Sequence, residues 1–519
     1  MEDSISRGAY KKGFRHSFVM AVSTAIRIIF GFLPQIIIAR QLGVGFTTDA
    51  YLMAISLNQI VIKFSRIGTL PKIFIMALSD DFVSDRKKIN ADINCIINAL
   101  FIISLLFMSV LYCIAPAFTN LIARGFGPEK QNLTTGIFKI LIPLFLYQCI
   151  IGLFEAIFKL FNAFSSWALL SIIPPAAIFI WVYLYTPKLG IYSIVYGTLV
   201  GSFIHVALLA YFVYFKFNYS YRPQLNLKNK LFPKMLKLLS PYYLSGIPVQ
   251  IMLGVQSFLV SLLPAGFASI FFYARRIVDY IEQFSVNIFS QLMLPYFTKK
   301  IAQFSLAHIR KTYNQLIYLT NYTHLPILIL IATFGRQLIN ILFTSKFTSP
   351  EIITKLGITF SAFILFYLPE PSNDVQSNVI LSLKKTMWLN LVNISRMVIT
   401  IFLSIVLFKY FAFWAIIFSY AISSLQGFII NQWYLRKQCA FENIFINPRF
   451  WKIIFLNIAL AIFCMYLNKL IYVVGSVYVY QRLMLISAAC LFAGLFYIFA
   501  SYLSKNEELK ILLSLVKKS

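Results

Sequence analysis

The sequence predicts an all-α membrane protein that crosses the bilayer many times, and three observations support this fold class. Hydrophobic residues make up 60% of the 519 residues, and charged residues make up only 12%, about half the charged share of a soluble globular protein. Apolar runs follow one another along almost the whole chain. Each is near or above the ~20 residues that a helix needs to cross a bilayer, and a soluble protein cannot bury so much apolar surface.

We expect about fourteen transmembrane helices. The clearest apolar run is the first, from Phe18 to Ala39. The pattern continues to Leu503, with later runs near 52–78, 94–123, 135–158, 167–186, 190–215, 239–263 and 267–297, and a final pair near 450–474 and 480–503.

The longest polar connection divides the chain. It follows the sixth run and predicts a cytoplasmic linker at 217–238. We therefore expect an N-terminal lobe of six helices at 1–216 and a C-terminal lobe of six helices at 239–438. An extra helix pair and a cytoplasmic tail would occupy 439–519.

The formal net charge of +29 is explained by membrane topology and not by nucleic-acid binding. Basic residues gather in alternate loops, as in Arg7, Lys11, Lys12 and Arg15 at the N-terminus, whereas the intervening loops are poor in them. This positive-inside pattern places both termini in the cytoplasm. The first run is too long for a cleavable signal peptide and lacks a small-residue cleavage site.

The six cysteines and four histidines do not form a metal site or a disulfide framework. The cysteines are scattered, mostly within apolar runs, and no metal-ligand spacing is present. Small apolar packing residues are the better interpretation of the cysteines. We expect no metal and no cofactor.

A short segment occurs twice. Gly-Phe-Thr-Thr at 45–48 opens the second apolar helix, and Gly-Phe-Ala-Ser at 266–269 opens the eighth. Internal repeats are common in secondary transporters, whose substrate site lies between the two halves, although short Gly-Phe segments also recur by chance.

Ionisable residues within apolar helices are the best site candidates, because they are costly in the membrane and usually face a cavity. Arg27 lies near the middle of the first helix, ahead of Pro34, which is expected to bend that helix. Lys63 lies near the inner end of the second helix, where it can also reach lipid headgroups. Asp49 opens the second helix, where an acid also serves as a cap.

Three other helices carry polar faces. In the eighth, Asp279 shares a face with Arg275 and Arg276 and can pair with them. Glu155 and Lys159 form a second pair at helical spacing in the fourth helix. Glu370 and Asp374 share one face of the tenth. A cavity that holds Arg27 and Arg276 would suit phosphate or pyrophosphate, since guanidinium groups match phosphate oxygens in pairs.

Residues 39–51 read Ala-Arg-Gln-Leu-Gly-Val-Gly-Phe-Thr-Thr-Asp-Ala-Tyr, and this segment resembles the MurJ (MviN) family of lipid II flippases. The family pattern there is roughly Ala-Arg-x-(Leu/Phe)-Gly-x-Gly-x-x-x-Asp-Ala-Phe. Residues 273–277, Tyr-Ala-Arg-Arg-Ile, are similar to the family's Tyr-Ala-Asp-Arg-Leu, and Asp279 falls on a family acid. The resemblance extends over nearly the whole chain by helix order.

The resemblance implies membership of the multidrug/oligosaccharidyl-lipid/polysaccharide exporter superfamily, with two lobes in a V shape around a cationic cavity. It also implies alternating access, which moves an undecaprenyl-pyrophosphate-linked saccharide from the inner to the outer leaflet. By match, Asp49, Arg276 and Asp279 carry over as transport residues, and Arg27 lies within one position of a family arginine. Two further family arginines fall on Pro34 and Ile62, with Lys63 adjacent, so the cavity is expected to be less cationic.

Lipid II is therefore the leading substrate, and another lipid-linked oligosaccharide, such as an O-antigen or exopolysaccharide unit, is the alternative. A drug/cation antiporter of related fold is less favoured, because it needs an acidic cavity. The acids Glu155, Glu370 and Asp374 nevertheless leave this alternative in place.

An enzyme is not expected, because the short outer loops carry no catalytic cluster. No nucleotide motif is present, so the membrane potential or an ion gradient is the expected drive. We expect the bacterial inner membrane as location, with membrane lipids and cell-wall synthesis proteins as partners.

Overall fold

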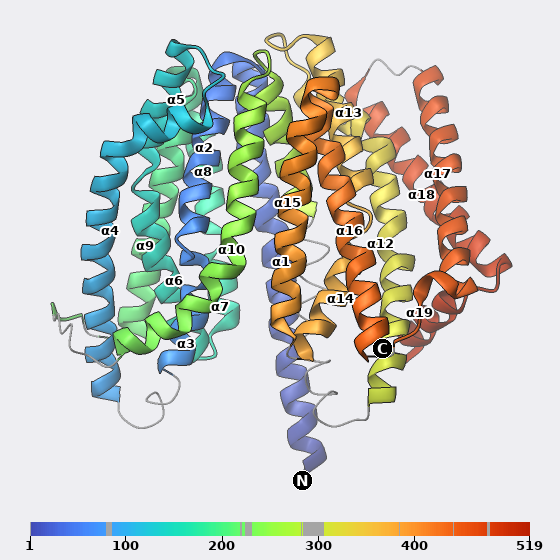
Figure 1. Cartoon of the computed structure of the whole chain (residues 1–519), viewed down its shortest axis with the longest axis horizontal. Helices are drawn as coiled ribbons and strands as arrows, with labels where there is room; N and C mark the ends of the chain where they lie inside the picture. Colours follow the sequence, from blue (N-terminus) through green and yellow to red (C-terminus); the bar gives the residue numbers. More distant parts are fainter. Residues whose placement is uncertain are drawn as a thin grey trace. The chain divides into compact units, whose positions relative to one another are not determined.

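The structure, a computed structural model, is mainly helical in the part of the chain that it describes (Figure 1). No strand occurs within those residues, which confirms the predicted all-α class. The described residues are 2–78, 86–217, 219, 221–223, 231–281, 283, 306–383, 385–439, 441–474 and 478–518.

The apolar composition of the helices accounts for their length. Eleven spans within the described residues are long and apolar enough to cross a membrane, which confirms a multi-pass membrane protein. Two shorter apolar helical stretches, Ile67–Ala77 and Ile247–Ser261, are added to these. The expected count of about fourteen transmembrane helices is not confirmed by this number.

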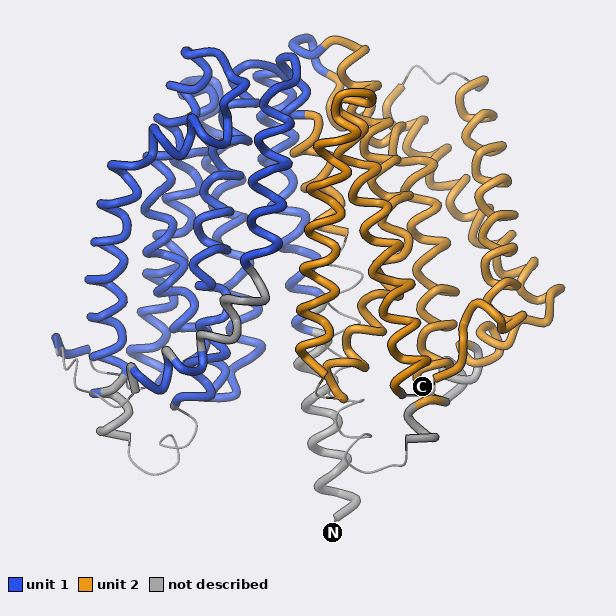
Figure 2. The backbone as a smooth tube through the Cα atoms, in the orientation of Figure 1, with its two compact units in different colours: residues 1–269, 345–348 blue, residues 270–344, 349–519 orange. Residues whose placement is uncertain are grey.

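The chain forms two compact units, shown in different colours in Figure 2: residues 1–269 with 345–348, and residues 270–344 with 349–519. The first unit contains α1 (Glu2–Leu42), α2 (Phe46–Phe64), the short 3-10 helix η1 (Ile67–Thr69), α3 (Leu70–Leu78), α4 (Arg86–Ile122), α5 (Pro128–Leu141), α6 (Leu144–Leu160), α7 (Phe164–Leu170), α8 (Ile173–Leu189), α9 (Tyr192–Phe217) and α10 (Leu231–Ser261).

The second unit begins inside a helix that covers residues 267–281. It continues with α12 (Leu306–Phe343), α13 (Pro350–Phe366), α14 (Glu370–Ser382), α15 (Thr386–Phe411), α16 (Phe413–Cys439), the 3-10 helix η2 (Ile444–Ile446), α17 (Pro448–Val474), α18 (Val479–Leu503) and α19 (Glu507–Lys518).

The compact units and the expected six-helix lobes divide the chain at different places. Helix α10, which we expected to open the C-terminal lobe, packs against α2, α3 and α4 of the first unit. It begins at Leu231, within the stretch predicted as the linker 217–238. Part of that stretch, 224–230, lies outside the described residues.

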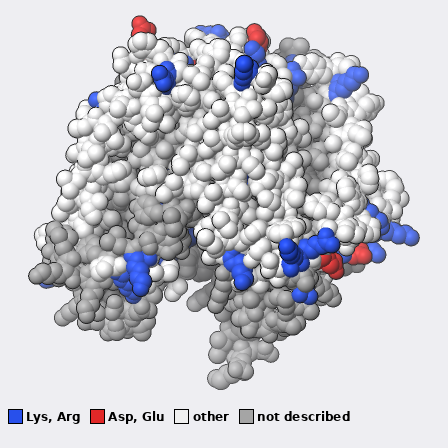
Figure 3. All heavy atoms as spheres, in the orientation of Figure 1, with Lys and Arg blue, Asp and Glu red and all other residues white. Residues whose placement is uncertain are grey.

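Large apolar side chains form the core of the second unit and also lie on its surface. Its core includes Tyr313, Ile317 and Phe334, each at most 1% exposed. Phe402 of α15 and Leu491 of α18 are instead more than 60% exposed, as expected for side chains that contact lipid. On the visible face of this unit, charged side chains lie near the helix ends and leave the middle uncharged (Figure 3).

The final helices are fastened to α12 by polar contacts. The Tyr322 hydroxyl donates to Ser501 Oγ over 2.8 Å, and the Tyr497 hydroxyl donates to the Tyr322 carbonyl over 2.9 Å. At the end of α18 the chain turns into α19, whose Glu508 accepts a hydrogen bond from Arg449 of α17 over 2.6 Å. The extra helix pair is therefore an integral part of the second unit.

Candidate functional site

The turn between α1 and α2 requires a glycine at position 43. Gly43 has φ of +75°, and a Cβ atom there would lie 2.3 Å from the Phe347 carbonyl oxygen, so only glycine fits without a shift of the backbone. The next residue, Val44, donates its N–H to Thr348 Oγ1 over 3.2 Å. The loop at 345–348 thus packs directly on the start of the motif at 39–51.

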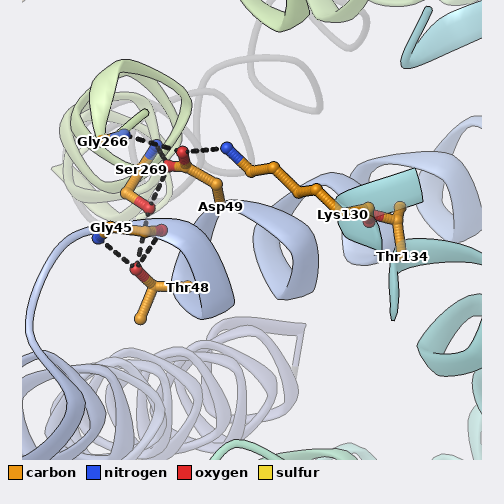
Figure 4. A network of polar contacts seen from close by, with 7 residues as sticks. All are labelled: Gly45, Thr48, Asp49, Lys130, Thr134, Gly266 and Ser269. Atoms are coloured by element: carbon orange, nitrogen blue, oxygen red, sulfur yellow. Dashed lines mark hydrogen bonds and ion pairs between the residues drawn. The ribbon is translucent and has the colours of Figure 1, made fainter. Parts of the chain in front are cut away.

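Asp49 is the centre of a buried polar network in the first unit (Figure 4). Its carboxylate accepts hydrogen bonds from the backbone N–H of Gly266 and of Ser269, each over 2.7 Å, and from Ser269 Oγ over 2.6 Å. Gly266 directly precedes the helix at 267–281, and Ser269 lies in its first turn. Asp49 therefore caps that helix, where the helix dipole also favours a negative charge.

Capping of α2 itself, the role that sequence reasoning gave to Asp49, falls to Thr48. Thr48 Oγ1 accepts the Gly45 N–H over 2.8 Å and donates to the Gly45 carbonyl over 3.0 Å. This frees the Asp49 carboxylate for a partner that is distant in the sequence.

Lys130, in the first turn of α5, supplies the counter-charge. Its Nζ lies 2.5 Å from Asp49 Oδ2, and the two side chains are 7% and 0% exposed. The same ammonium group lies 4.1 Å from the centre of the Phe126 ring, a cation–π distance. A buried carboxylate is tolerable only when it is paired and hydrogen-bonded, and Asp49 has both kinds of partner.

The two copies of the repeated segment meet in this network. Thr48 is the fourth residue of the first copy and Ser269 the fourth of the second, and their Oγ atoms lie 3.0 Å apart. Two helix starts that match in sequence are therefore in direct contact. The interpretation of 45–48 and 266–269 as an internal repeat stays a prediction.

The helix at 267–281 carries three of the predicted charged residues beyond its capped end: Arg275, Arg276 and Asp279. Arg275 Nε donates to Asp279 Oδ1 over 2.9 Å, which is the pairing expected from their spacing. The Arg275 guanidinium also lies 5.0 Å from the centre of the Tyr420 ring in α16. Arg276 is half-buried on the neighbouring face of the same helix.

Arg27 and Lys63 are both exposed, Arg27 on α1 and Lys63 in the last turn of α2. Helix α1 continues through Pro34 without a break in its helical residues. Arg27 belongs to the first unit and Arg276 to the second. The cavity that we expect them to share therefore stays a prediction.

The remaining predicted residues form ion pairs. Lys159 Nζ lies 2.5 Å from Glu155 Oε1 in α6. Glu370, at the start of α14, pairs with Arg396 of α15, and Asp374 lies one turn further along α14 and interacts electrostatically with the same guanidinium. Within the described residues, no group of three or more His, Cys, Asp or Glu side chains is placed to hold a metal ion.

Sequence reasoning missed two of the residues that matter most here. Neither Lys130 nor Arg396 was singled out as a site candidate from the sequence. A lysine directly after Gly-Pro-Glu at a helix start, and an arginine in the middle of an apolar run, are the signals that identify them.

Comparison with protein families gives one match over most of the chain. The family model described as "Lipid II flippase MurJ" matches residues 38–489. A probable lipid II flippase MurJ from Buchnera aphidicola subsp. Baizongia pistaciae is 26% identical over 467 residues, which cover 87% of this chain and 88% of the relative. Another from Rickettsia prowazekii is 22% identical over 360 residues, which cover 68% and 70%.

Solved structures show the same fold. A lipid II flippase MurJ in an inward closed conformation has a TM-score of 0.74 at 18% identity, covering 94% of this chain and 99% of that one. A multidrug resistance transporter of the MATE family, in an inward-facing conformation, has a TM-score of 0.63 at 15% identity, covering 79% and 98%. The fold is therefore one that both kinds of transporter share.

Proposed function

Because the chain belongs to the lipid II flippase MurJ family, we propose that it moves lipid II from the inner to the outer leaflet of the bacterial cytoplasmic membrane. The observation that carries this proposal is the family match over 38–489, which includes both copies of the repeated segment. The multi-pass helical fold is the framework that such a transporter needs. The MATE-like antiporter is supported only by the shared fold.

In this proposal the arginines hold the pyrophosphate of the substrate. Guanidinium groups offer paired N–H donors that match phosphate oxygens, and Arg27 and Arg276 are the candidates, with Lys63 as a weaker cationic neighbour. The exposure of Arg27 on α1 supports this role, because a mid-helix arginine is costly in the membrane unless it faces water or an anion.

In this proposal the Asp49 network rearranges during the transport cycle. Asp49 holds the first turn of the helix at 267–281, and Arg276 and Asp279 lie on that helix two to three turns further along. A shift of this helix start therefore also moves the groups proposed to bind the headgroup. We propose that this helix carries the rearrangement to the substrate site during alternating access.

Several expectations belong to the same proposal. Both termini face the cytoplasm, as the basic loops predict. Transport is driven by the membrane potential or an ion gradient, with Glu370 and Asp374 as candidate coupling groups and Glu155 and Lys159 as polar residues of the transport path. Partners are the lipid-linked substrate, membrane lipids and, we propose, proteins of cell-wall synthesis. Another lipid-linked oligosaccharide remains the alternative substrate, because Pro34 and Ile62 occupy two arginine positions of the family.

Replacement of a lipid II flippase by this chain tests the proposal. In cells depleted of their own flippase, expression of the chain should restore growth and bring lipid II to the outer leaflet, measured by a leaflet-specific assay. Arg276→Ala, produced to the same level in the membrane, should fail in both measurements. Restored surface polysaccharide without outer-leaflet lipid II would instead select the alternative substrate.

A further inference from the structure

Helix α12 carries an arginine within its apolar span that no acid among the described residues neutralises. Arg336 lies in the candidate span Thr312–Phe343, and its side chain is half-buried. Its Nε atom is buried and has no hydrogen-bond partner, and no ion pair or cation–π contact among the described residues involves its guanidinium group. An ionisable group in an apolar span is costly and marks a functional site, so this charge indicates a binding site.

The stem of Arg336 is held in place by the neighbouring helix. A Cβ atom at Gly357 of α13 would lie 2.9 Å from Arg336 Cγ and 3.2 Å from its Cα. One residue earlier in α12, a Cβ atom at Gly335 would lie 2.3 Å from Phe360 Cε1. The two helices therefore approach closely at these glycines, and the arginine stem packs where a side chain at 357 would lie. Its guanidinium group is thus more restricted than that of an arginine on an open surface, which can bend freely toward water.

A side-chain amide lies one turn further along the same face of α12. Asn340 follows Arg336 at the i+4 position, which places the two side chains next to each other. Its Oδ1 atom is also buried without a partner, and its side-chain amide forms no hydrogen bond with the described residues. Because the amide can rotate to present either its oxygen or its NH₂ group, Asn340 can add a donor beside the guanidinium.

The surrounding helix ends leave no carboxylate for Arg336. Its neighbour Gln337 donates through Nε2 to Asn468 Oδ1 over 2.5 Å, so α17 packs against α12 at this level. Among the described residues at this end of α12, α13, α17 and α18, Glu351 is the single acid. Lys355 pairs with it over 2.8 Å. The positive charge of Arg336 is therefore not balanced from within this part of the second unit.

The depth of Arg336 in the membrane matches the level of lipid headgroups. The span Thr312–Phe343 has 32 residues, about 48 Å of helix at ~1.5 Å per residue, whereas the hydrocarbon layer is ~30 Å thick. With the excess divided equally between both ends, the hydrocarbon boundary lies about 9 Å from Phe343. Arg336 precedes Phe343 by about 10 Å of helix and so lies at that boundary. By the predicted topology, this end of α12 faces the outer leaflet.

These features select an oxyanion as the ligand. A guanidinium group offers paired N–H donors that match phosphate oxygens, and the buried Nε is one donor of such a pair. A water molecule would satisfy Nε but leave the charge unbalanced, and a cation is excluded by the sign of the site. Basic pockets between transmembrane helices bind lipid headgroups, and the phosphate is the oxyanion of these headgroups.

We propose that Arg336, with Asn340 as a supporting donor, binds a phosphate group at this end of the seam between α12 and α13. A lipid headgroup is the favoured source because of the depth of Arg336, and a free phosphate ion is the other source. The site is independent of the proposed function, because it uses none of the residues assigned to transport.

Thermal unfolding of the purified full-length chain, in a detergent without phosphate groups, tests the site. Dioctanoyl phosphatidylglycerol should raise the unfolding temperature and reach saturation, because a ligand that binds only the folded state stabilises it. Dioctanoylglycerol, which lacks the phosphate, should not. Arg336→Gln should weaken binding of the phospholipid by about 10-fold, since a hydrogen bond to a charged group is lost. Lys355→Gln, which removes an exposed lysine of α13, is the matched control and should leave the binding unchanged.

Two further measurements keep the test decisive. Without lipid, Arg336→Gln should unfold at the same temperature as the unmodified chain or higher, because the guanidinium has no partner to lose among the described residues. A lower temperature would indicate a structural role and contradict the site. Gly357→Ala keeps the charge but displaces the arginine stem, and it should weaken binding. Gly494→Ala, which adds a Cβ atom in open space, should not.

The source of the phosphate is decided by titration with inorganic phosphate. No response to this ion, together with a response to the phospholipid that depends on Arg336, supports a lipid headgroup as the ligand. A saturable response to inorganic phosphate that Arg336→Gln abolishes would identify the free ion as the ligand. Equal responses of the unmodified chain and of Arg336→Gln to both phosphate compounds would overturn the proposal, whatever the outcome of the lipid II transport assay.

Discussion

Lys130 Nζ lies 2.5 Å from Asp49 Oδ2, and this ion pair is buried between the first turns of α2 and α5 (Figure 4). Removing one partner of a buried pair leaves an uncompensated charge and costs about 3–5 kcal/mol. We therefore expect Lys130→Met and Asp49→Asn each to destabilise the network strongly. The double variant removes both charges and should be less destabilised than the sum of the two.

The test is a double-mutant cycle with two measurements. The first is the thermal stability of the purified protein. The second is the reactivity of a cysteine introduced at Ser56 toward a membrane-impermeant thiol reagent. Ser56 lies two turns beyond Asp49 in α2, where its Oγ contacts Ser257 Oγ over 2.9 Å. Both single variants should raise its reactivity. Additive effects in the double variant would show that the pair does not hold the helices together.

The Asp49 network also shows which parts of the site can be predicted from the sequence and which cannot. Asp49 is found from its place in a motif of 13 residues, and the Arg275–Asp279 pair from helical spacing, because both signals are local. The capping partner of Asp49 is Ser269, 220 residues away, and the partner of Glu370 is Arg396 on another helix. Contacts of this kind depend on which helices pack together, which periodicity does not determine. The fold class followed from composition and run length alone, since few alternatives accommodate so much apolar surface.

Arg276 should be required for transport in a way that depends on the shape of its side chain. A hydrogen bond to a charged group is worth about 1.5–3 kcal/mol, so Arg276→Ala should lower the rate of lipid II translocation by roughly 10- to 100-fold. Arg276→Lys keeps the charge but loses the paired donors. Its translocation rate should therefore lie between those of the unmodified chain and of Arg276→Ala. A lysine variant that transports as well as the unmodified chain would show that charge alone is needed.

Gly43 should be irreplaceable, whereas Gly45 in the same motif should not be. Alanine at Gly43 would be strained by the positive φ and would clash with the Phe347 carbonyl, so we expect a loss of about 1–3 kcal/mol and displacement of the loop at 345–348. Gly45 has φ of −179° and no atom within 4 Å of an added Cβ, which makes Gly45→Ala the matched control. Thermal unfolding of the two variants compares them directly, and equal stabilities would argue against the close approach of this loop.

The topology predicts opposite labelling of two exposed residues near helix ends. Arg222 follows α9 in the basic connection to α10, and Lys188 lies at the end of α8. In a variant without native cysteines, Arg222→Cys should resist a membrane-impermeant thiol reagent added to intact cells, and Lys188→Cys should react. The reversed pattern would invert the orientation that the basic loops predict.

The two acids at the start of α19 should differ in their contribution to stability although both bind Arg449. Glu507 lies 2.7 Å from Arg449 Nη1 but is 65% exposed, whereas Glu508 lies 2.6 Å from Nε and is 0% exposed. An exposed ion pair contributes about 0–1 kcal/mol, and a buried charged hydrogen bond about 1.5–3 kcal/mol. Glu508→Gln should therefore lower the unfolding temperature clearly and loosen α19 from α17, seen as faster amide hydrogen exchange. Glu507→Gln should change little, and equal effects of the two substitutions would mean that burial of Glu508 does not fasten this helix.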